Sequence, residues 1–240
     1  MWRKKKIQPV EAGTRNQSAR EAWLERTLKK IPPGSRILDA GAGELQYKRF
    51  CAHLVYVSQD FGRYDGKGDR RGLQTEKREG SNVDIVCDIT DIPEADGSFD
   101  AVMCVEVLEH LPDPLPALRE FRRLLGKGGR LVLTAPFCSL THYAPYHFVT
   151  GFNRYYYEHH LAALGFRILD IAENGNFFEY LAQEVRRVPL CAEKYSSHRL
   201  SGKDNAVIRD LLQALGRLSE TDGGSGELLC YGYHVFAEKE

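Results

Sequence analysis

The sequence lacks the paired cysteines that mark disulfide frameworks and zinc sites. Its six cysteines are scattered along 240 residues, and no two form a Cys-x-x-Cys pair. Four of them lie in apolar or strand-like settings, so we expect buried, reduced thiols and no metal site. The chain starts with Trp2 and a basic run but has no apolar run behind them, so we expect no secretory signal. These absences together predict a cytoplasmic protein.

An excess of charge of either sign is also absent. Lys and Arg number 33 and Asp and Glu number 33, which gives a formal net charge of zero. Nucleic-acid-binding domains usually carry a basic excess, so no nucleic-acid partner is expected. Residues 131–153 carry no charged side chain, but Pro136, Pro145 and two histidines interrupt them. A strand followed by a polar, aromatic loop is therefore expected there, rather than a membrane span.

The most informative stretch comprises residues 36–44, where a short apolar strand leads into Asp39, Gly41 and Gly43. Glycine has no Cβ, so the backbone can turn tightly and a ligand can lie against it. Apolar side chains at helical spacing predict a helix directly after this turn; they are Tyr47, Phe50, Cys51 and Leu54. Open α/β sheets bind nucleotide-like ligands at such a turn.

Strand-like segments alternate with helix-like segments along most of the chain. The expected strands are 36–38, 54–57, 83–87, 99–104, 130–134, 166–171 and 229–237. This alternation predicts an α/β fold, a Rossmann-like, doubly wound and mostly parallel sheet of seven strands. A long segment precedes the last strand, which we expect to return antiparallel at the edge of the sheet.

The sequence further predicts a helical extension over residues 1–30 and a main domain over residues 31–240. A helical insertion over residues 176–226 interrupts that domain, and it contains an amphipathic stretch around Val207 and Leu211. This stretch either packs on its own sheet or docks on a second subunit, so a homodimer formed through the insertion is one expectation.

Three successive expected strands are followed by an acid, namely Asp39, Asp60 and Asp88. A single acid at a strand end usually caps the next helix. However, Asp60 lies 19 residues after Gly41, a spacing typical of an acid that binds a ribose diol. The dinucleotide fingerprint also requires a third glycine, which this turn lacks. The pattern therefore favours a nucleoside ligand without phosphates, such as S-adenosylmethionine.

The ordered set of motifs resembles the class I S-adenosylmethionine-dependent methyltransferases over about residues 31–171. The segments that carry the resemblance are 37–43, Asp60, 86–89, 98–102, 105–110 and 125–131. They look most like a small-molecule subgroup often found near sugar and surface-polysaccharide pathways, and the loop 141–148 is similar to the loop of that subgroup.

The resemblance implies a role for each matching position. Ala40, Gly41 and Gly43 would lie under the methionine part of the cofactor. Asp60 would hold the ribose, with Gln59 and Phe61 beside the adenine. Asp88 and Ile89 would contact the adenine, and Glu106 would line the sulfonium pocket. Asp39 belongs to the same cofactor-binding set.

A hydroxyl acceptor must lose a proton on methylation, and histidine is the usual base near neutral pH. The candidates at the carboxyl edge of the sheet are His110, His142 and His147, together with Glu109. His142 and His147 flank two tyrosines over the expected acceptor pocket, whereas His110 is equally well explained by packing.

Two other functions fit parts of the pattern. A nicotinamide-dependent oxidoreductase would use Asp60 in the same way, but the third glycine is missing. A non-catalytic module would bind the cofactor, or a partner through the insertion, without methyl transfer. A small-molecule methyltransferase accounts for the strand-end acids and the histidine-rich loop together, although the residues do not specify the acceptor.

Overall fold

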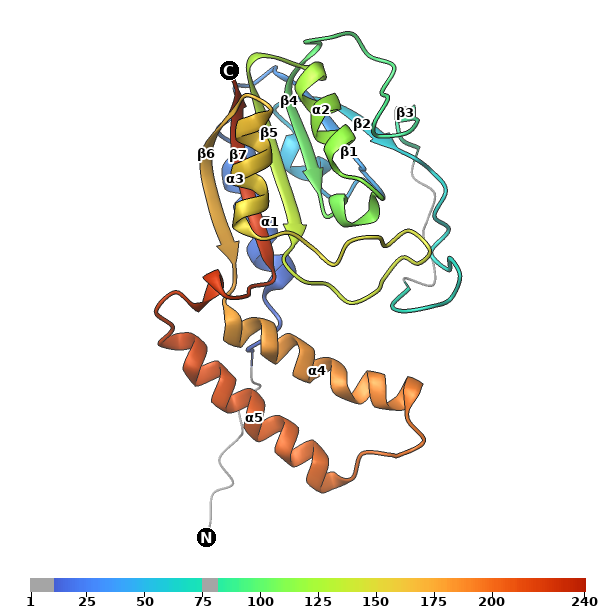
Figure 1. Ribbon diagram of the computed structural model, residues 1–240, viewed down its shortest axis with the longest axis vertical. Coiled ribbons are helices and arrows are strands. Elements are labelled where there is room, and N and C mark those ends of the chain that lie inside the picture. The colour runs from blue at the N-terminus through green and yellow to red at the C-terminus, as the bar shows by residue number, and fades with distance from the viewer. Residues whose placement is uncertain (1–10, 75–81) are drawn as a thin grey trace. The chain divides into compact units, whose positions relative to one another are not determined.

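The computed structural model describes residues 11–74 and 82–240, and it contains a seven-stranded sheet (Figure 1). The strands are β1 (Arg36–Ala40), β2 (Val55–Asp60), β3 (Ile85–Val86), β4 (Phe99–Val105), β5 (Leu125–Pro136), β6 (Phe166–Asn174) and β7 (Gly232–Lys239). Their order is β3-β2-β1-β4-β5-β7-β6, and the first five strands are parallel. The predicted α/β class and mostly parallel sheet are confirmed.

The last strand is antiparallel, as expected, but it does not lie at the edge. β7 runs between β5 and β6 and is antiparallel to both. It is buried along most of its length, and Val235 and Ala237 are fully covered. A strand so apolar is more stable inside the sheet than at an edge, and β6, with its half-exposed pattern, forms the edge instead.

The predicted helix after the glycine turn is wrong. Only the 3-10 turn η1 (Lys48–Cys51) forms there, although Tyr47 and Cys51 are buried as the spacing suggested. Gly43 and Leu45 both have positive φ, so the chain leaves the turn in a conformation that a helix cannot continue. Only three residues separate η1 from β2. Between the glycine turn and β2, all of which the structure describes, no long helix directs the positive N-terminal end of its dipole at the turn.

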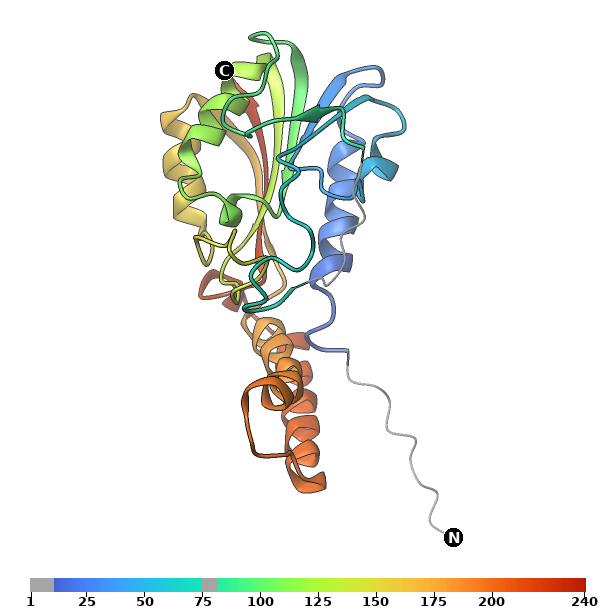
Figure 2. The ribbon, with the colours of Figure 1, turned by 90° about the vertical axis from the view of Figure 1, so that its right-hand side faces the viewer.

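Helices cover both faces of the sheet. α1 (Asn16–Leu28) lies on one face, and α2 (Leu115–Leu124) and α3 (Arg154–Ala163) lie on the other (Figure 2). Trp23, Leu24 and Leu28 of α1 join one buried cluster with Ile37 and Met103 of the sheet. Alternate residues of a strand point to opposite faces of the sheet. Because helices cover both faces, the central strands carry apolar side chains on both.

The rest of the described chain forms a helical hairpin of α4 (Phe177–Tyr195) and α5 (Gly202–Glu220), followed by the 3-10 turn η3 (Ser225–Glu227). Asn176 caps α4, and Ser201 and Asp204 form a reciprocal capping box on α5. The predicted helical insertion is therefore helical. Leu212 and Leu215 pack inside the hairpin, whereas Val207 and Leu211 are exposed.

The described residues divide into two compact units. One comprises residues 11–19 with 175–231, and the other comprises residues 20–74 and 82–174 with 232–240. The expected domain boundaries stay a prediction; the apolar stripe of α1 from Trp23 onward packs on the sheet. Among the helices of the described residues, none is long and apolar enough to span a bilayer.

His234 is a buried histidine in β7 that stacks on Trp23, with ring centroids 4.9 Å apart. Burial lowers its pKa to about 3, and the charges of Arg20 and Arg26 act in the same direction. In the unfolded chain the ring titrates near pH 6.5. Between these values the unfolded chain binds a proton that the folded protein does not, so the folded state is destabilised as the pH falls.

Replacement of His234 by Phe should keep the stacking and reduce the acid sensitivity of the fold. Between pH 7 and pH 5 the wild type should lose about 2 kcal/mol more unfolding free energy than His234→Phe. Urea denaturation of both proteins at the two pH values measures the difference. Equal losses in the two proteins would contradict the assignment of a neutral, buried His234.

Candidate active site

The glycine turn after β1 is fixed by contacts with β2 and with the segment after β4. The amides of Gly41 and Ala42 donate to the Gln59 carbonyl at 2.9 and 2.8 Å. Gly41 has φ +78°, and a Cβ at this position would lie 2.5 Å from a methyl group of Val107. A side chain at Gly41 would therefore be strained and would also collide with its neighbour.

The two residues at the end of β2 hold this turn together. Asp60 is only 6% exposed, and its carboxylate accepts from the amide of Gly43 at 3.1 Å and from the amide of Gly62 at 2.8 Å. The Gln59 side chain accepts from Gly41 and donates to the carbonyl of Cys87. Both residues therefore position the loops of the expected cofactor site, and their direct contacts with ribose and adenine stay predictions.

The remaining adenine-side residues lie at the next strand ends. Asp88 is exposed and accepts from the amide and hydroxyl of Thr90, and these hydrogen bonds lower its pKa. Ile89 is buried, so its side chain can form only the wall of a site. Phe61 makes an edge-to-face contact with Tyr146, with centroids 5.1 Å apart. Their cofactor roles also stay predictions.

Asp39 is a buried acid beneath the turn, and Ala40 beside it is fully buried. Burial raises the pKa of Asp39 to about 7, against the opposing effect of a hydrogen bond from the Tyr56 hydroxyl at 2.5 Å. The nearby charge of Asp60 raises the pKa further. Asp39 thus lies within the core below the turn, and its part in cofactor binding stays a prediction.

Glu106 follows β4 and is held by two side chains. Its carboxylate accepts from the Thr134 hydroxyl at 2.8 Å and pairs with Arg20 of α1 at 3.2 Å. Glu106 has φ +55°, an uncommon conformation for a residue other than glycine that is concentrated at functional sites. Arg20 also donates to the Tyr47 hydroxyl. A carboxylate fixed beside the glycine turn suits a sulfonium cation.

Arg20 is one residue of this site that sequence reasoning missed. It lies four residues before Leu24, on the stripe of α1 that faces the sheet. A charged residue on an otherwise apolar helix face was the available signal, because an arginine is rarely buried unless it is paired.

A cluster of titratable side chains lies at the same edge of the sheet. The 3-10 turn η2 (Leu108–His110) presents Glu109 and His110, and the loop after β5 brings His142 and His147 against them. Glu109 is 1% exposed, and burial raises its pKa well above the usual range, with a further contribution from the charge of Glu106. The three predicted histidines are therefore brought together, and their catalytic role stays a prediction.

The histidine ring contacts define the arrangement. The ring of His142 lies 4.7 Å from that of His110 and 4.8 Å from that of His147, and Tyr143 stacks on His110. His147 Nε2 lies 3.1 Å from the Ser139 hydroxyl. Burial lowers the pKa of His147, and the proximity of His142 lowers it further.

Two loops meet beside this cluster. Leu73 and His142 form a parallel bridge, and the amides of Leu73 and Asp69 donate to the carbonyls of Thr141 and Ala144. The segment from 62 to 74 therefore pairs with the loop after β5. Residues 75–81 lie outside the described chain.

A cavity of about 460 Å³ lies away from this site. It lies at the amino end of β5, beside the end of α2, and its lining includes Arg122, Arg123 and Lys239. Arg122 and Lys239 already donate to the carbonyls of Leu164 and Leu125, and Arg123 pairs with Asp96. These basic groups therefore stabilise local structure.

Comparisons with known proteins agree with this geometry. Residues 38–133 match the methyltransferase domain family. The chain is 29% identical over 196 residues to a demethylmenaquinone methyltransferase of Corynebacterium urealyticum, covering 79% of this chain and 77% of the relative. It is 38% identical over 104 residues to a ubiquinone biosynthesis O-methyltransferase of Xanthomonas oryzae pv. oryzae, covering 42% of this chain and 43% of the relative.

A similar fold occurs in the solved structure of geranyl diphosphate C-methyltransferase from Streptomyces coelicolor A3(2). The TM-score is 0.53 at 15% identity, and the match covers 98% of this chain and 87% of that one. The fold is that of the class I S-adenosylmethionine-dependent methyltransferases. Residues 38–133 form the methyltransferase domain that the family model describes.

The residues present fit S-adenosylmethionine. Gly41 and Gly43 carry no side chains at the turn, and both have positive φ. Glu106 would line the sulfonium pocket, a role that stays a prediction, and the acid Asp60 lies at the end of the neighbouring strand. The cofactor prediction is confirmed by the family and its neighbours.

Replacement of Gly41 by Ala should weaken cofactor binding. Gly34 offers a matched control because it has φ +81° and its Cβ would meet nothing within 4 Å. Both substitutions impose a similar backbone strain of roughly 1 kcal/mol, but only Gly41→Ala collides with Val107. Calorimetry with S-adenosylhomocysteine should show more than tenfold weaker binding for Gly41→Ala and less than a twofold change for Gly34→Ala. Equal affinities of the two variants would contradict the assigned turn.

Proposed function

We propose that the enzyme methylates a hydroxyl oxygen of a small organic acceptor bound beside the cluster of Glu109, His110, His142 and His147. The observation that carries this proposal is the convergence of three histidines on the buried acid Glu109, which follows Glu106 by three residues. Such a cluster is expected where a proton must be removed, since catalytic bases are often tuned by burial and by like charges.

The chain's own residues bind and orient the cofactor in this proposal. Gly41 and Gly43 support the methionine part, and Asp60 binds the ribose hydroxyls. Arg20 and Thr134 hold the carboxylate of Glu106 toward the sulfonium. When bound, S-adenosylmethionine supplies a methyl group that is already activated for displacement, so the protein contributes mainly alignment.

The loop after β5 supplies the base, His147. His147 has a lowered pKa, so its ring is neutral near pH 7 and can accept a proton from an acceptor hydroxyl. Ser139 orients the ring through the contact with Nε2. Tyr143 and Tyr146 on either side of the cis Ala144–Pro145 bond offer aromatic faces to the acceptor.

For the acceptor we propose a sugar or a surface-polysaccharide precursor. This proposal is supported by the resemblance of the 141–148 loop to the sugar-type subgroup and by the aromatic faces of that loop. The second candidate is a phenolic quinone precursor, which the names of the demethylmenaquinone and ubiquinone relatives favour.

The acceptor proposal can be tested by release of S-adenosylhomocysteine in the presence of nucleotide-linked sugars, phenolic quinone precursors and methylamines in parallel. We expect turnover with the sugars, and we expect His147→Gln to lower kcat by about 100-fold with little effect on cofactor affinity. Gly41→Ala serves as the inactive control.

Turnover with the phenolic quinone precursors alone would contradict a sugar acceptor and support the second candidate. Turnover only with amines would contradict hydroxyl methylation. Tight cofactor binding with no turnover on any acceptor class would favour the non-catalytic module.

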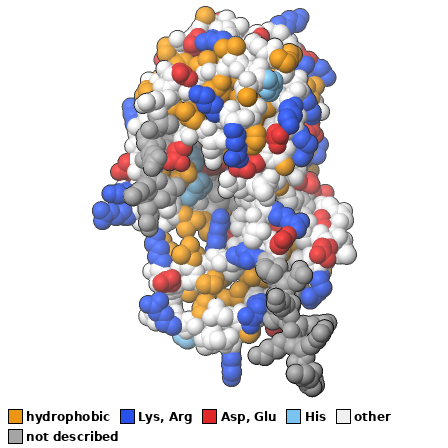
Figure 3. Space-filling view, turned by 180° about the vertical axis from the view of Figure 1, so that it is seen from behind, with side chains coloured by type: hydrophobic (Ala, Val, Ile, Leu, Met, Phe, Trp, Pro, Cys, Tyr) orange, Lys and Arg blue, Asp and Glu red, His pale blue; other side chains and the backbone are white. Residues whose placement is uncertain are grey.

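We also propose that the chain forms a homodimer through the helical insertion at 176–226. The proposal is supported by exposed apolar side chains on both helices, namely Val188, Leu190, Val207, Leu211 and Leu218. Figure 3 shows apolar side chains at the surface of the helical unit. Light scattering should give a dimer for the wild type and a monomer for the double variant Val207→Lys, Leu211→Lys. A wild-type monomer at micromolar concentration would contradict the proposal.

A cytoplasmic location is likewise proposed. It is supported by the cysteines, all six of which lie in the described part of the chain as thiols.

A further inference from the structure

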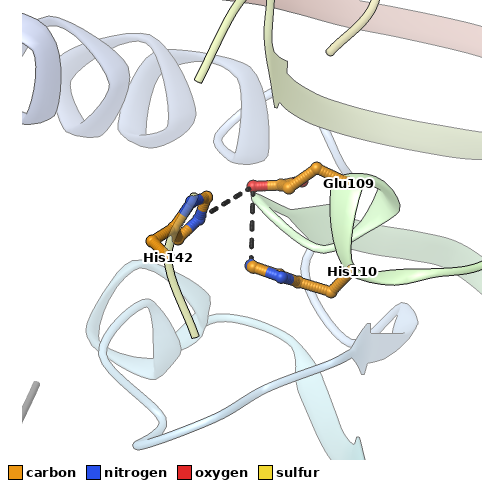
Figure 4. A group of neighbouring side chains, drawn as sticks. All are labelled: Glu109, His110 and His142. Atoms are coloured by element: carbon orange, nitrogen blue, oxygen red, sulfur yellow. Dashed lines mark ion pairs between the residues drawn. The ribbon is translucent and has the colours of Figure 1, made fainter. Parts of the chain in front are cut away.

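Glu109, His110 and His142 face one another across a small gap (Figure 4). We propose that these three side chains bind one divalent transition-metal ion, with Zn²⁺ the ion that best fits the ligand set. The inference deepens the proposed function, on which its catalytic meaning rests, but the binding of the ion can be tested independently.

The distances fit a shared ion. Glu109 Oε1 lies 3.7 Å from His110 Nε2 and 3.9 Å from His142 Nε2, and the three ligand atoms all lie within 4.8 Å of one another. These distances are too long for hydrogen bonds. Two ligands of a tetrahedral Zn²⁺ with bonds of about 2.0–2.1 Å lie roughly 3.3–3.5 Å apart. Small rotations of the side chains are enough to close the difference.

The tautomers of the two histidines also fit a metal site. His110 Nδ1 lies 2.5 Å from the Tyr146 carbonyl oxygen, and His142 Nδ1 lies 2.8 Å from that of Leu140. A carbonyl oxygen can only accept, so the proton of each neutral ring is assigned to Nδ1. Each Nε2 then presents a lone pair toward Glu109. Metal-binding histidines are held in this way, with the second ring nitrogen donating to a carbonyl.

Glu109 contributes a ligand that gains from a cation. Its carboxyl group is 1% exposed, and Oε2 has no hydrogen-bond partner among the described residues. The peptide carbonyl of Glu109 accepts from the amides of Phe148 and Val149, which fixes the backbone. The Glu109 carboxylate oxygen and the Nε2 atoms of His110 and His142 are all hydrogen-bond acceptors, so no donor lies between them. A bound cation compensates that arrangement.

The ligand set indicates the kind of ion and leaves coordination positions for a substrate. Two imidazoles and one carboxylate suit Zn²⁺ and its transition-metal neighbours better than Mg²⁺ or Ca²⁺, which prefer oxygen ligands. Three protein ligands are typical of open, catalytic sites. His147 lies beside the cluster, but its Nε2 contacts Ser139, so we do not count it among the ligands.

The position of the site near Glu106 suits an ion that activates the methyl acceptor. Glu109 and His110 follow Glu106 by three and four residues on η2. An acceptor hydroxyl bound to the ion would become more acidic, as a metal-bound water does. The hydroxyl proton leaves to solvent or to His147, and the oxygen is left ready for methylation.

The test uses the tag-free full chain after treatment with a chelator. Titration with ZnCl₂ by calorimetry should give one ion per chain. Each of Glu109→Gln, His110→Gln and His142→Gln should weaken binding by at least about 100-fold, because each removes one of three ligands. His160→Gln, which alters a histidine of α3 outside the cluster, should change the affinity less than twofold.

Two further measurements keep the inference falsifiable if a variant is poorly folded. Excess Zn²⁺ should raise the Tm of the wild type and of His160→Gln but not of the three ligand variants. Co²⁺ should give intense visible absorption only in proteins with the complete site. Zn²⁺ binding that is unchanged in Glu109→Gln and His142→Gln, or no binding by the wild type, would overturn the inference.

The two proposals fail in different ways. If the wild type binds S-adenosylhomocysteine and methylates an acceptor equally well with and without chelator, the metal site is overturned and the proposed function stands. If Zn²⁺ binds with the predicted variant pattern but no acceptor is methylated, the site stands and the proposed function fails.

Discussion

The site depends on the packing of the glycine turn against two neighbouring strand ends. The amides of Gly41 and Ala42 are satisfied by the carbonyl of Gln59, and Gly41 lies directly on Val107. These contacts tie the ends of β1, β2 and β4 together without a long helix behind the turn. The residues that contact the cofactor in the proposal, and the η2 turn that presents Glu109 and His110, are positioned relative to this one junction.

Buried charge is the second constraint on this edge of the sheet. Asp39, Asp60 and Glu109 are all nearly inaccessible to solvent, and each is a carboxyl group whose ionised form is costly to bury. Asp60 is compensated by two amides, Asp39 by a hydroxyl, and Arg20 brings one positive charge to Glu106. Glu109 has the least compensation of these groups, which is consistent with a site that is completed by a cation.

The sequence predicted the parts of the fold that depend on local pattern. Apolar runs between turn residues located all seven strands, and the spacing from Gly41 to Asp60 located the cofactor edge. The shortness of η1 and the position of β7 were not predictable, because they depend on positive φ at Leu45 and on which strand pairs with β5. The histidines were identified as candidates from loop position alone. Their ring orientations depend on carbonyls of Tyr146 and Leu140, whose directions no pattern encodes.

The pairing of the loop after β2 with the loop after β5 joins the two halves of the site. Phe61, next to the predicted ribose ligand Asp60, contacts Tyr146, and Leu73 pairs with His142. The cofactor side and the acceptor side thus share one hydrogen-bonded unit. Any displacement of that unit on cofactor binding alters acceptor affinity by some factor, and linkage then requires the acceptor to alter cofactor affinity by the same factor. The coupling between the two ligands would therefore be a property of these two loops as much as of either binding site.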